Sequence, residues 1–195
     1  MKQDPFPRPA GGGKPPRTQA LRIFLAAAAS ALMAALSFSQ MPSGKDVVAP
    51  AAYVSADPAA RNVPFQIAVV MTIRPGFHVN AREKSEDYLI ATDLKFDLPV
   101  GFTAGEVAYP RGTLHTFSFA KDKPLNIYEG TVTLRVPLAA SSAASLGPQR
   151  LAFKLRYQAC SNEACLPPVT LPVEATVNIA ASGAKPSHAD IFAPR

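Results

Sequence analysis

The chain has 195 residues, of which 48% are hydrophobic, with a formal net charge of +6 and two cysteines. This length suits one ordinary domain of roughly 100 to 200 residues with a terminal extension, and it would crowd two domains. The positive charge does not indicate a nucleic-acid partner, because such binding needs Lys and Arg clustered on one face, and beyond the amino terminus they are scattered among acidic residues.

The amino terminus has the layout of a secretory signal. Five basic residues lead into an apolar run of 16 residues over 23–38, which ends in Ser37-Phe38-Ser39. A membrane span needs about 20 apolar residues, so we expect a signal peptide over residues 1–39, with an uncleaved inner-membrane anchor as the alternative. Without this segment 15 basic and 13 acidic residues remain, and the net charge falls to +2.

The next stretch, residues 40–62, is weakly patterned and rich in Ala, Pro and Ser. We expect a linker there, with Val47-Val48 and Tyr53-Val54 as an optional short edge strand. The folded domain is expected over residues 63–180. The remaining residues, 181–195, are expected to form a flexible tail.

Alternation of apolar and polar residues predicts most of the strands. The clearest segments are residues 65–73, 94–98, 131–138, 151–157 and 169–179. Weaker strands are expected at residues 77–80 and 102–109, and a hairpin over residues 113–126. Turn residues recur roughly every 8 to 12 positions and no helix is expected after the signal, a pattern that predicts an all-β, immunoglobulin-like antiparallel β-sandwich.

The tip of the predicted hairpin, residues 113–124, carries the aromatic residues Phe117 and Phe119. Pro124 excludes a central strand at this point. Aromatic side chains on an irregular tip either pack under their own loop or cover a site. The residues alone leave both roles open.

Cys160 and Cys165 enclose four residues on the connection between the last two predicted strands. In an oxidising compartment a disulfide is the default for such a pair. A bridge across so small a loop constrains the unfolded chain by only about 2 kcal/mol, and a domain of this size has enough core not to require it. A structural disulfide and a redox-active pair therefore both stay open.

The thiols are the only groups with distinctive chemistry in this sequence. The three histidines, His78, His115 and His188, lie far apart without ligand spacing, so no metal and no cofactor are expected. No arrangement of nucleophile, base and orienting group can be recognised.

The segment from Tyr157 through Cys160 and Cys165 to Thr170 resembles the redox-active segment of the amino-terminal periplasmic domain of DsbD, the thiol:disulfide interchange protein. Further pieces resemble landmarks of that family in the same order. These are Gly76-Phe77-His78-Val79-Asn80, Asp87-Tyr88-Leu89-Ile90-Ala91-Thr92, Tyr109-Pro110 and Ile127-Tyr128-Glu129-Gly130. The resemblance covers about residues 60–180 and is most specific at the cysteines.

This resemblance implies an immunoglobulin-like domain that takes electrons from a membrane-embedded thiol reductase and passes them to thioredoxin-like periplasmic proteins, as in cytochrome c biogenesis. By position, Cys165 is the cysteine that forms mixed disulfides and Cys160 is its resolving partner. Phe117 or Phe119 is the expected covering ring of a cap loop. The remaining site-lining residues are expected to be Phe77, His78, Asn80 and Tyr157.

Proteins of this family usually continue into a multi-span membrane domain and a thioredoxin-like domain, whereas this sequence stops at Arg195. A separate polypeptide is therefore the expected electron donor. The main hypothesis is a stand-alone periplasmic component of a protein-disulfide oxidoreductase system, with no nucleic acid and no small-molecule substrate. The alternative is a non-catalytic exported binding module with a permanent structural disulfide.

Overall fold

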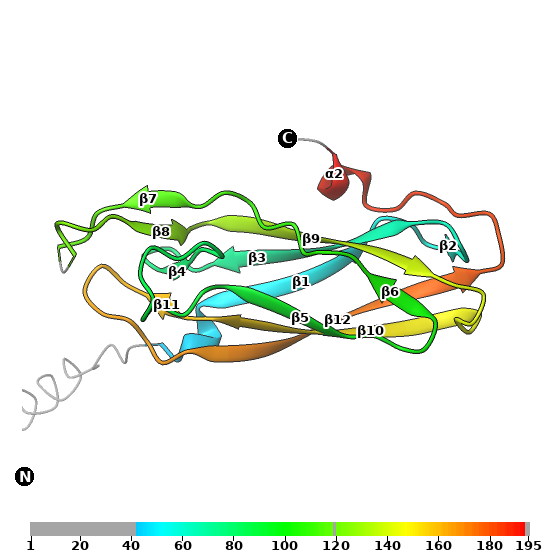
Figure 1. Ribbon diagram of the computed structural model, residues 1–195, viewed down its shortest axis with the longest axis horizontal. Coiled ribbons are helices and arrows are strands. Elements are labelled where there is room, and N and C mark those ends of the chain that lie inside the picture. Colours follow the sequence, from blue (N-terminus) through cyan, green and yellow to red (C-terminus); the bar gives the residue numbers. More distant parts are fainter. Residues whose placement is uncertain (1–41, 119, 194–195) are drawn as a thin grey trace, which may run out of the picture. The chain divides into compact units, whose positions relative to one another are not determined.

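The computed structural model describes residues 42–118 and 120–193. The predicted signal peptide or anchor and the cap candidate Phe119 lie outside the described residues. The elements in chain order are η1 (Gly44–Asp46), β1 (Val48–Val54), β2 (Ala59–Ala60), β3 (Phe65–Ile73), β4 (His78–Asn80), β5 (Asp93–Asp97), β6 (Phe102–Ala104), β7 (Thr113–His115), β8 (Leu125–Tyr128), β9 (Thr131–Ala140), β10 (Gly147–Tyr157), β11 (Ala159–Cys160), β12 (Val169–Ala180) and α2 (Ala189–Phe192) (Figure 1). In these ranges no helix has the length and apolar character of a membrane span.

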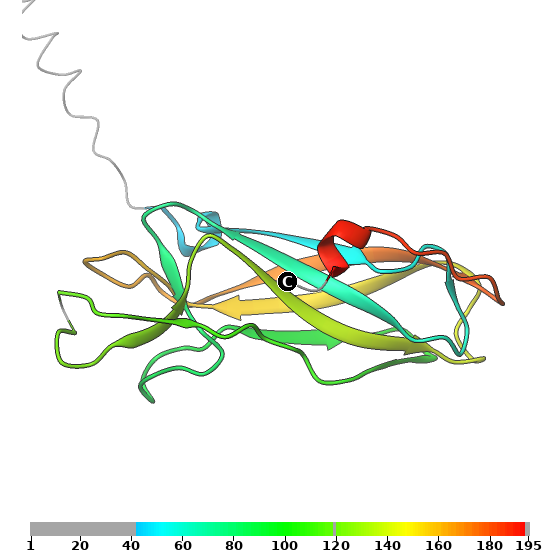
Figure 2. The same ribbon diagram turned by 90° about the horizontal axis from the view of Figure 1, so that it is seen from above.

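Three four-stranded sheets are found among the described residues, in the orders β1-β3-β9-β6, β2-β12-β10-β5 and β11-β4-β8-β7. Their strand pairs are antiparallel, except that β2 runs parallel to β12. The first two sheets pack face to face as an immunoglobulin-like β-sandwich, which confirms the predicted fold class. The third sheet and the cysteine loop lie at the same end of the sandwich in both views (Figures 1 and 2).

The main core forms because alternate residues of the long strands point between the two large sheets. From Val173 to Ile179, β12 alternates strictly between buried and exposed residues, and in β9 every second residue is buried. In β10, Leu151, Phe153 and Leu155 are buried, with Phe153 opposite Val173 of β12. Burying one side chain of this size contributes about 1.5 to 3 kcal/mol to the stability of the fold. The alternation of apolar residues along these strands therefore favours two sheets packed face to face.

Residues 40–62, expected to be a linker, contain β1 and β2. Strand β1 pairs with β3 along its whole length, from Val48 opposite Ile73 to Val54 opposite Ile67. Because the middle of β1 is Ala-rich and contains Pro50, its sequence has little hydrophobic contrast. Proline is tolerated there since β1 is an edge strand. The folded unit therefore includes η1 and β1 and is longer than the predicted 63–180.

The carboxyl-terminal segment, expected to be a flexible tail, is bonded to the sandwich in residues 185–193. The backbone of Lys185 accepts from the amide of Asp57 at 2.9 Å and donates to the carbonyl of Pro58 at 3.0 Å. The Arg135 guanidinium donates to the carbonyl of Ile191 in α2 at 2.8 Å. Backbone bonds of this kind leave no periodic trace in a sequence, which is why the pattern did not predict them.

Candidate functional site

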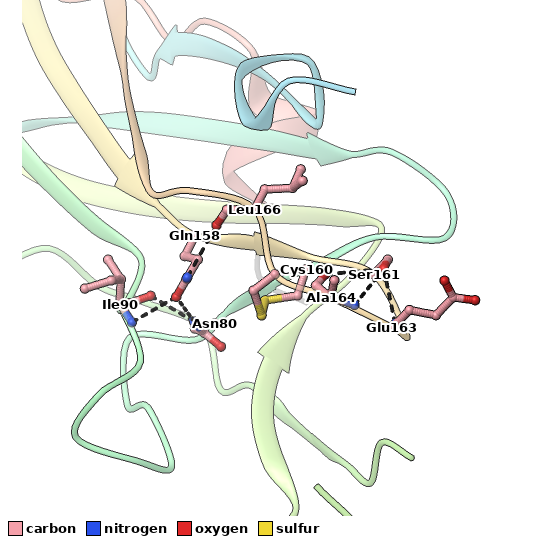
Figure 3. Close-up of a disulfide and its surroundings, with 9 residues drawn as sticks. Asn80, Ile90, Gln158, Cys160, Ser161, Glu163, Ala164 and Leu166 are labelled. Atoms are coloured by element: carbon pink, nitrogen blue, oxygen red, sulfur yellow. Dashed lines mark hydrogen bonds between the residues drawn. A yellow bond between two sulfur atoms is a disulfide. The ribbon is translucent and has the colours of Figure 1, made fainter. Parts of the chain in front are cut away.

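Cys160 and Cys165 form a disulfide across a small hairpin, with an S–S distance of 2.01 Å and a Cα–Cα distance of 3.9 Å (Figure 3). The two residues pair as antiparallel neighbours. On either side of them, the Ser161 amide donates to the Ala164 carbonyl and the Leu166 amide to the Ala159 carbonyl, each at 2.8 Å. The cysteines thus occupy the non-hydrogen-bonded position, where opposite Cα atoms of two strands come closest.

The hairpin tip is shaped by Ser161. Its hydroxyl oxygen accepts from the backbone amides of Glu163 and Ala164, both at 3.2 Å (Figure 3). A serine that bonds the backbone two and three residues ahead favours a turn over a continued strand. This local bonding explains why β11 ends at Cys160 and why the chain returns at Cys165.

The two cysteines differ in exposure. Cys160 is 0% exposed, whereas Cys165 is an exposed residue on the returning arm of the hairpin. Strand β11 carries Cys160 into the third sheet, where it lies opposite His78 of β4. Thiol exchange depends on which sulfur an incoming thiolate can reach. The arrangement therefore favours attack at Cys165 over attack at Cys160.

The register of the third sheet places a set of side chains on the same side as Cys160. Residues directly opposite each other in a β-ladder share a face, as do residues two apart in one strand. We call this surface the site face. It consists of Cys160, His78, Asn80, Leu125, Ile127, Thr113 and His115.

Phe117, from the tip between β7 and β8, packs onto this site face. Its ring is stacked on His78 with centroids 4.3 Å apart and lies 4.4 Å from the ring of His115. Phe117 is only 3% exposed and belongs to a small second core with Leu89, Leu125 and Ile127. The same ring thus packs under its own loop and covers the histidine beside Cys160.

Two polar atoms on the site face are buried and have no hydrogen-bond partner among the described residues. They are Nε2 of His78 and Oδ1 of Asn80. Leaving a buried polar group unpaired costs about 1 to 3 kcal/mol. Burial, and to a smaller extent the nearby His115, lowers the pKa of His78 from 6.5 to about 4. At neutral pH the imidazole next to Cys160 is therefore uncharged.

Gln158 connects the cysteine hairpin to β4 and to the loop over residues 81–92. Its Oε1 accepts from Asn80 Nδ2 and from the Ile90 amide, and its Nε2 donates to the Leu166 carbonyl, each at 3.4 Å (Figure 3). Asn80 Nδ2 also donates to the Ile90 carbonyl at 3.1 Å. In the sequence Gln158 lies within the cysteine segment, two residues before Cys160, and this position is the signal that could have assigned it to the site.

Tyr157 and Phe77 are not on the site face. Tyr157 is fully buried in the main core, where its hydroxyl donates to the Gly44 carbonyl at 2.8 Å and burial raises its pKa to about 12. Phe77 is half-buried and packs against the same core. Of the expected site residues that the structure describes, it brings together Cys160, Cys165, His78, Asn80 and Phe117. Sequence reasoning did not assign Leu89, His115 or Gln158 to this site.

Across the described residues, no group of three or more His, Cys, Asp or Glu side chains is placed to hold a metal ion. The chemistry that the arrangement offers is that of a disulfide with one accessible end. Exchange of such a disulfide with an external thiol requires neither a metal nor an organic cofactor.

The sequence model of the family described as "Thiol:disulfide interchange protein DsbD, N-terminal" matches residues 46–176. Among solved structures, the chain is similar to the DsbD N-terminal domain of Neisseria meningitidis in the reduced form, with 18% identity, a TM-score of 0.44, and coverage of 76% of this chain and 96% of that chain. It is also similar to the N-terminal periplasmic domain of ScsB from Proteus mirabilis, with 16% identity, a TM-score of 0.43, and coverage of 65% of this chain and 45% of that chain. No curated protein matches the sequence.

Proposed function

Since the chain belongs to the family of the N-terminal domain of thiol:disulfide interchange protein DsbD, we propose that it is a periplasmic thiol-disulfide exchange module working through Cys160 and Cys165. The observation that carries this proposal is the unequal exposure of the two cysteines, 0% for Cys160 against an exposed Cys165. A purely structural bridge gains nothing from this asymmetry. An exchanging bridge uses it to direct the incoming thiolate to one sulfur.

The exchange proceeds in two steps that move two electrons. A thiolate of the electron donor attacks Sγ of Cys165, the S–S bond breaks, and Cys160 leaves as a thiolate that takes up a proton from solvent. The second thiolate of the donor then attacks the donor sulfur of the mixed disulfide and releases the Cys165 thiolate. The domain is now a dithiol and the donor holds a disulfide.

Transfer to an oxidised acceptor uses the same atoms in the opposite direction. The Cys165 thiolate attacks the acceptor disulfide and forms a mixed disulfide with it. Cys160 then loses its proton to solvent and attacks Sγ of Cys165 as a thiolate, which restores the internal bond and releases the reduced acceptor. In this scheme Cys165 contacts each partner, and Cys160 resolves each complex from its buried position beside His78.

The proposed donor is a membrane-embedded thiol reductase, and the proposed acceptors are thioredoxin-like periplasmic proteins. Residues 1–39 would export the domain to the compartment in which both act. Phe117 is the proposed cap, because it covers the imidazole next to the buried cysteine. His78 and Asn80 are the proposed lining of the site.

A pair of single-cysteine variants tests this assignment. Reduced Cys160→Ser and Cys165→Ser are each mixed with the disulfide form of a thioredoxin, quenched with acid, alkylated and separated by non-reducing electrophoresis. Cys160→Ser, which keeps the exposed thiol, should trap the mixed disulfide at least tenfold more than Cys165→Ser. Equal trapping, or none in either variant, contradicts the proposal.

The wild-type domain provides the second measurement. Dithiothreitol should reduce its disulfide while circular dichroism still reports the folded sandwich. A disulfide that opens only after unfolding would instead favour the alternative function, a binding module with a permanent structural bridge.

A further inference from the structure

His78 carries a buried ring nitrogen, Nε2, for which the oxidised structure offers no hydrogen-bond partner among the described residues. The residue is 1% exposed, so water does not reach it freely either. Native proteins leave few buried polar atoms unpaired, and each such atom calls for a specific explanation. In this case the explanation lies in the residue that faces His78 across the sheet.

Cys160 lies directly opposite His78 in the β4–β11 ladder. Side chains of opposite residues share a face, with Cβ atoms about 4.5 to 5.5 Å apart, which is within reach of an imidazole and a sulfur. The other groups placed around the imidazole are the ring of Phe117, stacked on its face, and His115, which packs against Phe117. Asn80 lies two residues after His78 in β4, opposite Ile127, and its Nδ2 donates a hydrogen bond to Gln158.

The sulfur of Cys160 changes its hydrogen-bonding capacity when the disulfide opens. In a disulfide it has no proton to donate and is a weak acceptor. As a thiolate it is a charged acceptor, and as a thiol it has an S–H donor. A partner for His78 Nε2 therefore comes into being when the protein is reduced.

We propose that Nε2 of His78 is the hydrogen-bond partner of the Cys160 sulfur in the reduced protein, an inference that rests on the proposed exchange function. With the proton on Nε2, the imidazole donates to the Cys160 thiolate as it leaves. With the proton on the other ring nitrogen, Nε2 accepts from the S–H of the thiol. The proton that Cys160 takes up comes from solvent, and the imidazole holds one proton throughout.

This contact makes opening of the disulfide more favourable. A thiolate released into an apolar environment is destabilised by burial. A neutral donor beside it lowers that cost without adding a permanent charge. His78 is suited to this because burial keeps its pKa at about 4, so the ring is neutral at physiological pH. The oxidised state has the unpaired nitrogen, and the reduced state pairs it.

The test compares two histidine-to-phenylalanine variants in a glutathione redox titration. His78→Phe keeps a ring against Phe117 but has no ring nitrogen. His115→Phe is the matched control, because His115 also packs its ring against Phe117 and the substitution is the same. Because the chain has no tryptophan, the reduced fraction is measured by acid quench, alkylation and mass spectrometry. The equilibrium constant for reduction should fall about tenfold in His78→Phe, a shift of about 30 mV to a more negative potential. In His115→Phe it should change less than twofold.

The wild-type protein provides a readout that needs no variant. The Nε2 nitrogen of His78 should change its NMR chemical shift on reduction, and those of His115 and His188 should not. If the cysteine pair of His78→Phe still exchanges and has an unchanged reduction potential, this inference is overturned and the proposed function stands. An unchanged chemical shift of His78 Nε2 on reduction of the wild-type protein has the same consequence. Failure of Cys160→Ser to trap a mixed disulfide at Cys165 overturns the proposed function, and with it this inference.

Discussion

His78 should make the folded domain lose stability in mild acid. Its pKa is lowered from 6.5 to about 4 in the folded protein, first by burial and then by the nearby His115. In the unfolded chain His78 has its ordinary pKa and binds a proton more readily. Stability rises with pH wherever the unfolded state binds more protons, so stability here is lost as the pH falls from 6.5 towards 4.

The size of this loss follows from the two pKa values. One pKa unit corresponds to about 1.36 kcal/mol, so the interval between 6.5 and about 4 is worth roughly 3 kcal/mol in total. Between pH 7 and pH 5 the unfolding free energy should fall by about 2 kcal/mol, because most of this pH range lies between the unfolded and the folded pKa of His78. His78 is 1% exposed, so solvent screening removes little of it.

Urea unfolding of the oxidised protein at pH 7 and pH 5 measures the loss. Wild type should lose about 2 kcal/mol more than His78→Phe, because phenylalanine keeps the ring against Phe117 and cannot be protonated. The control His115→Phe leaves His78 buried and should retain most of the wild-type loss. An equal pH dependence of the unfolding free energy in wild type and His78→Phe would refute this reasoning.

Three further substitutions test the surroundings of the site. Phe117→Ala should lower the unfolding free energy by about 3 kcal/mol. It should also raise the pKa of His78 in an NMR titration, since burial is the main cause of the lowered pKa of this residue. A His78 pKa that stays near 4 would mean that groups other than Phe117 bury the imidazole. Tyr157→Phe removes the hydroxyl that donates to the Gly44 carbonyl, so it should cost about 1 kcal/mol in urea unfolding. It should leave the rate of reduction by dithiothreitol unchanged, whereas slower reduction would give Tyr157 a role in the site. The Ile90 amide donates to Oε1 of Gln158 at 3.4 Å, so Gln158→Ala should speed hydrogen exchange of this amide by up to about tenfold. Unchanged exchange would mean that this contact does not stabilise the loop over residues 81–92.

The long strands could be predicted from the sequence because period two is a local property. Residues 65–73 were predicted as a strand and are β3, and the predicted strand at 131–138 is most of β9. Strand β1 could not be predicted with the same certainty, because alanine and proline in it give weak contrast. Its extended state depends on pairing with the edge of β3, a contact that its own residues do not encode.

The candidate site was predictable in part. The cysteine pair stands out by composition, and the family resemblance pointed to His78, Asn80 and Phe117, which the structure brings to one face. Tyr157 was expected there as well, but it lies three residues before Cys160. An odd separation along extended chain puts two side chains on opposite faces, so Tyr157 enters the main core.

By itself the sequence determined the sandwich, the place of the disulfide between two core strands and the family, because hydrophobic alternation and a cysteine spacing are local features. Only the tertiary structure decided that Cys160 is buried while Cys165 is exposed, and that an unpaired histidine nitrogen lies on the strand beside the buried sulfur. Both follow from the register of β11 against β4, a pairing of distant segments. Register is set by the fit of whole faces in the folded domain, and no single segment carries that information.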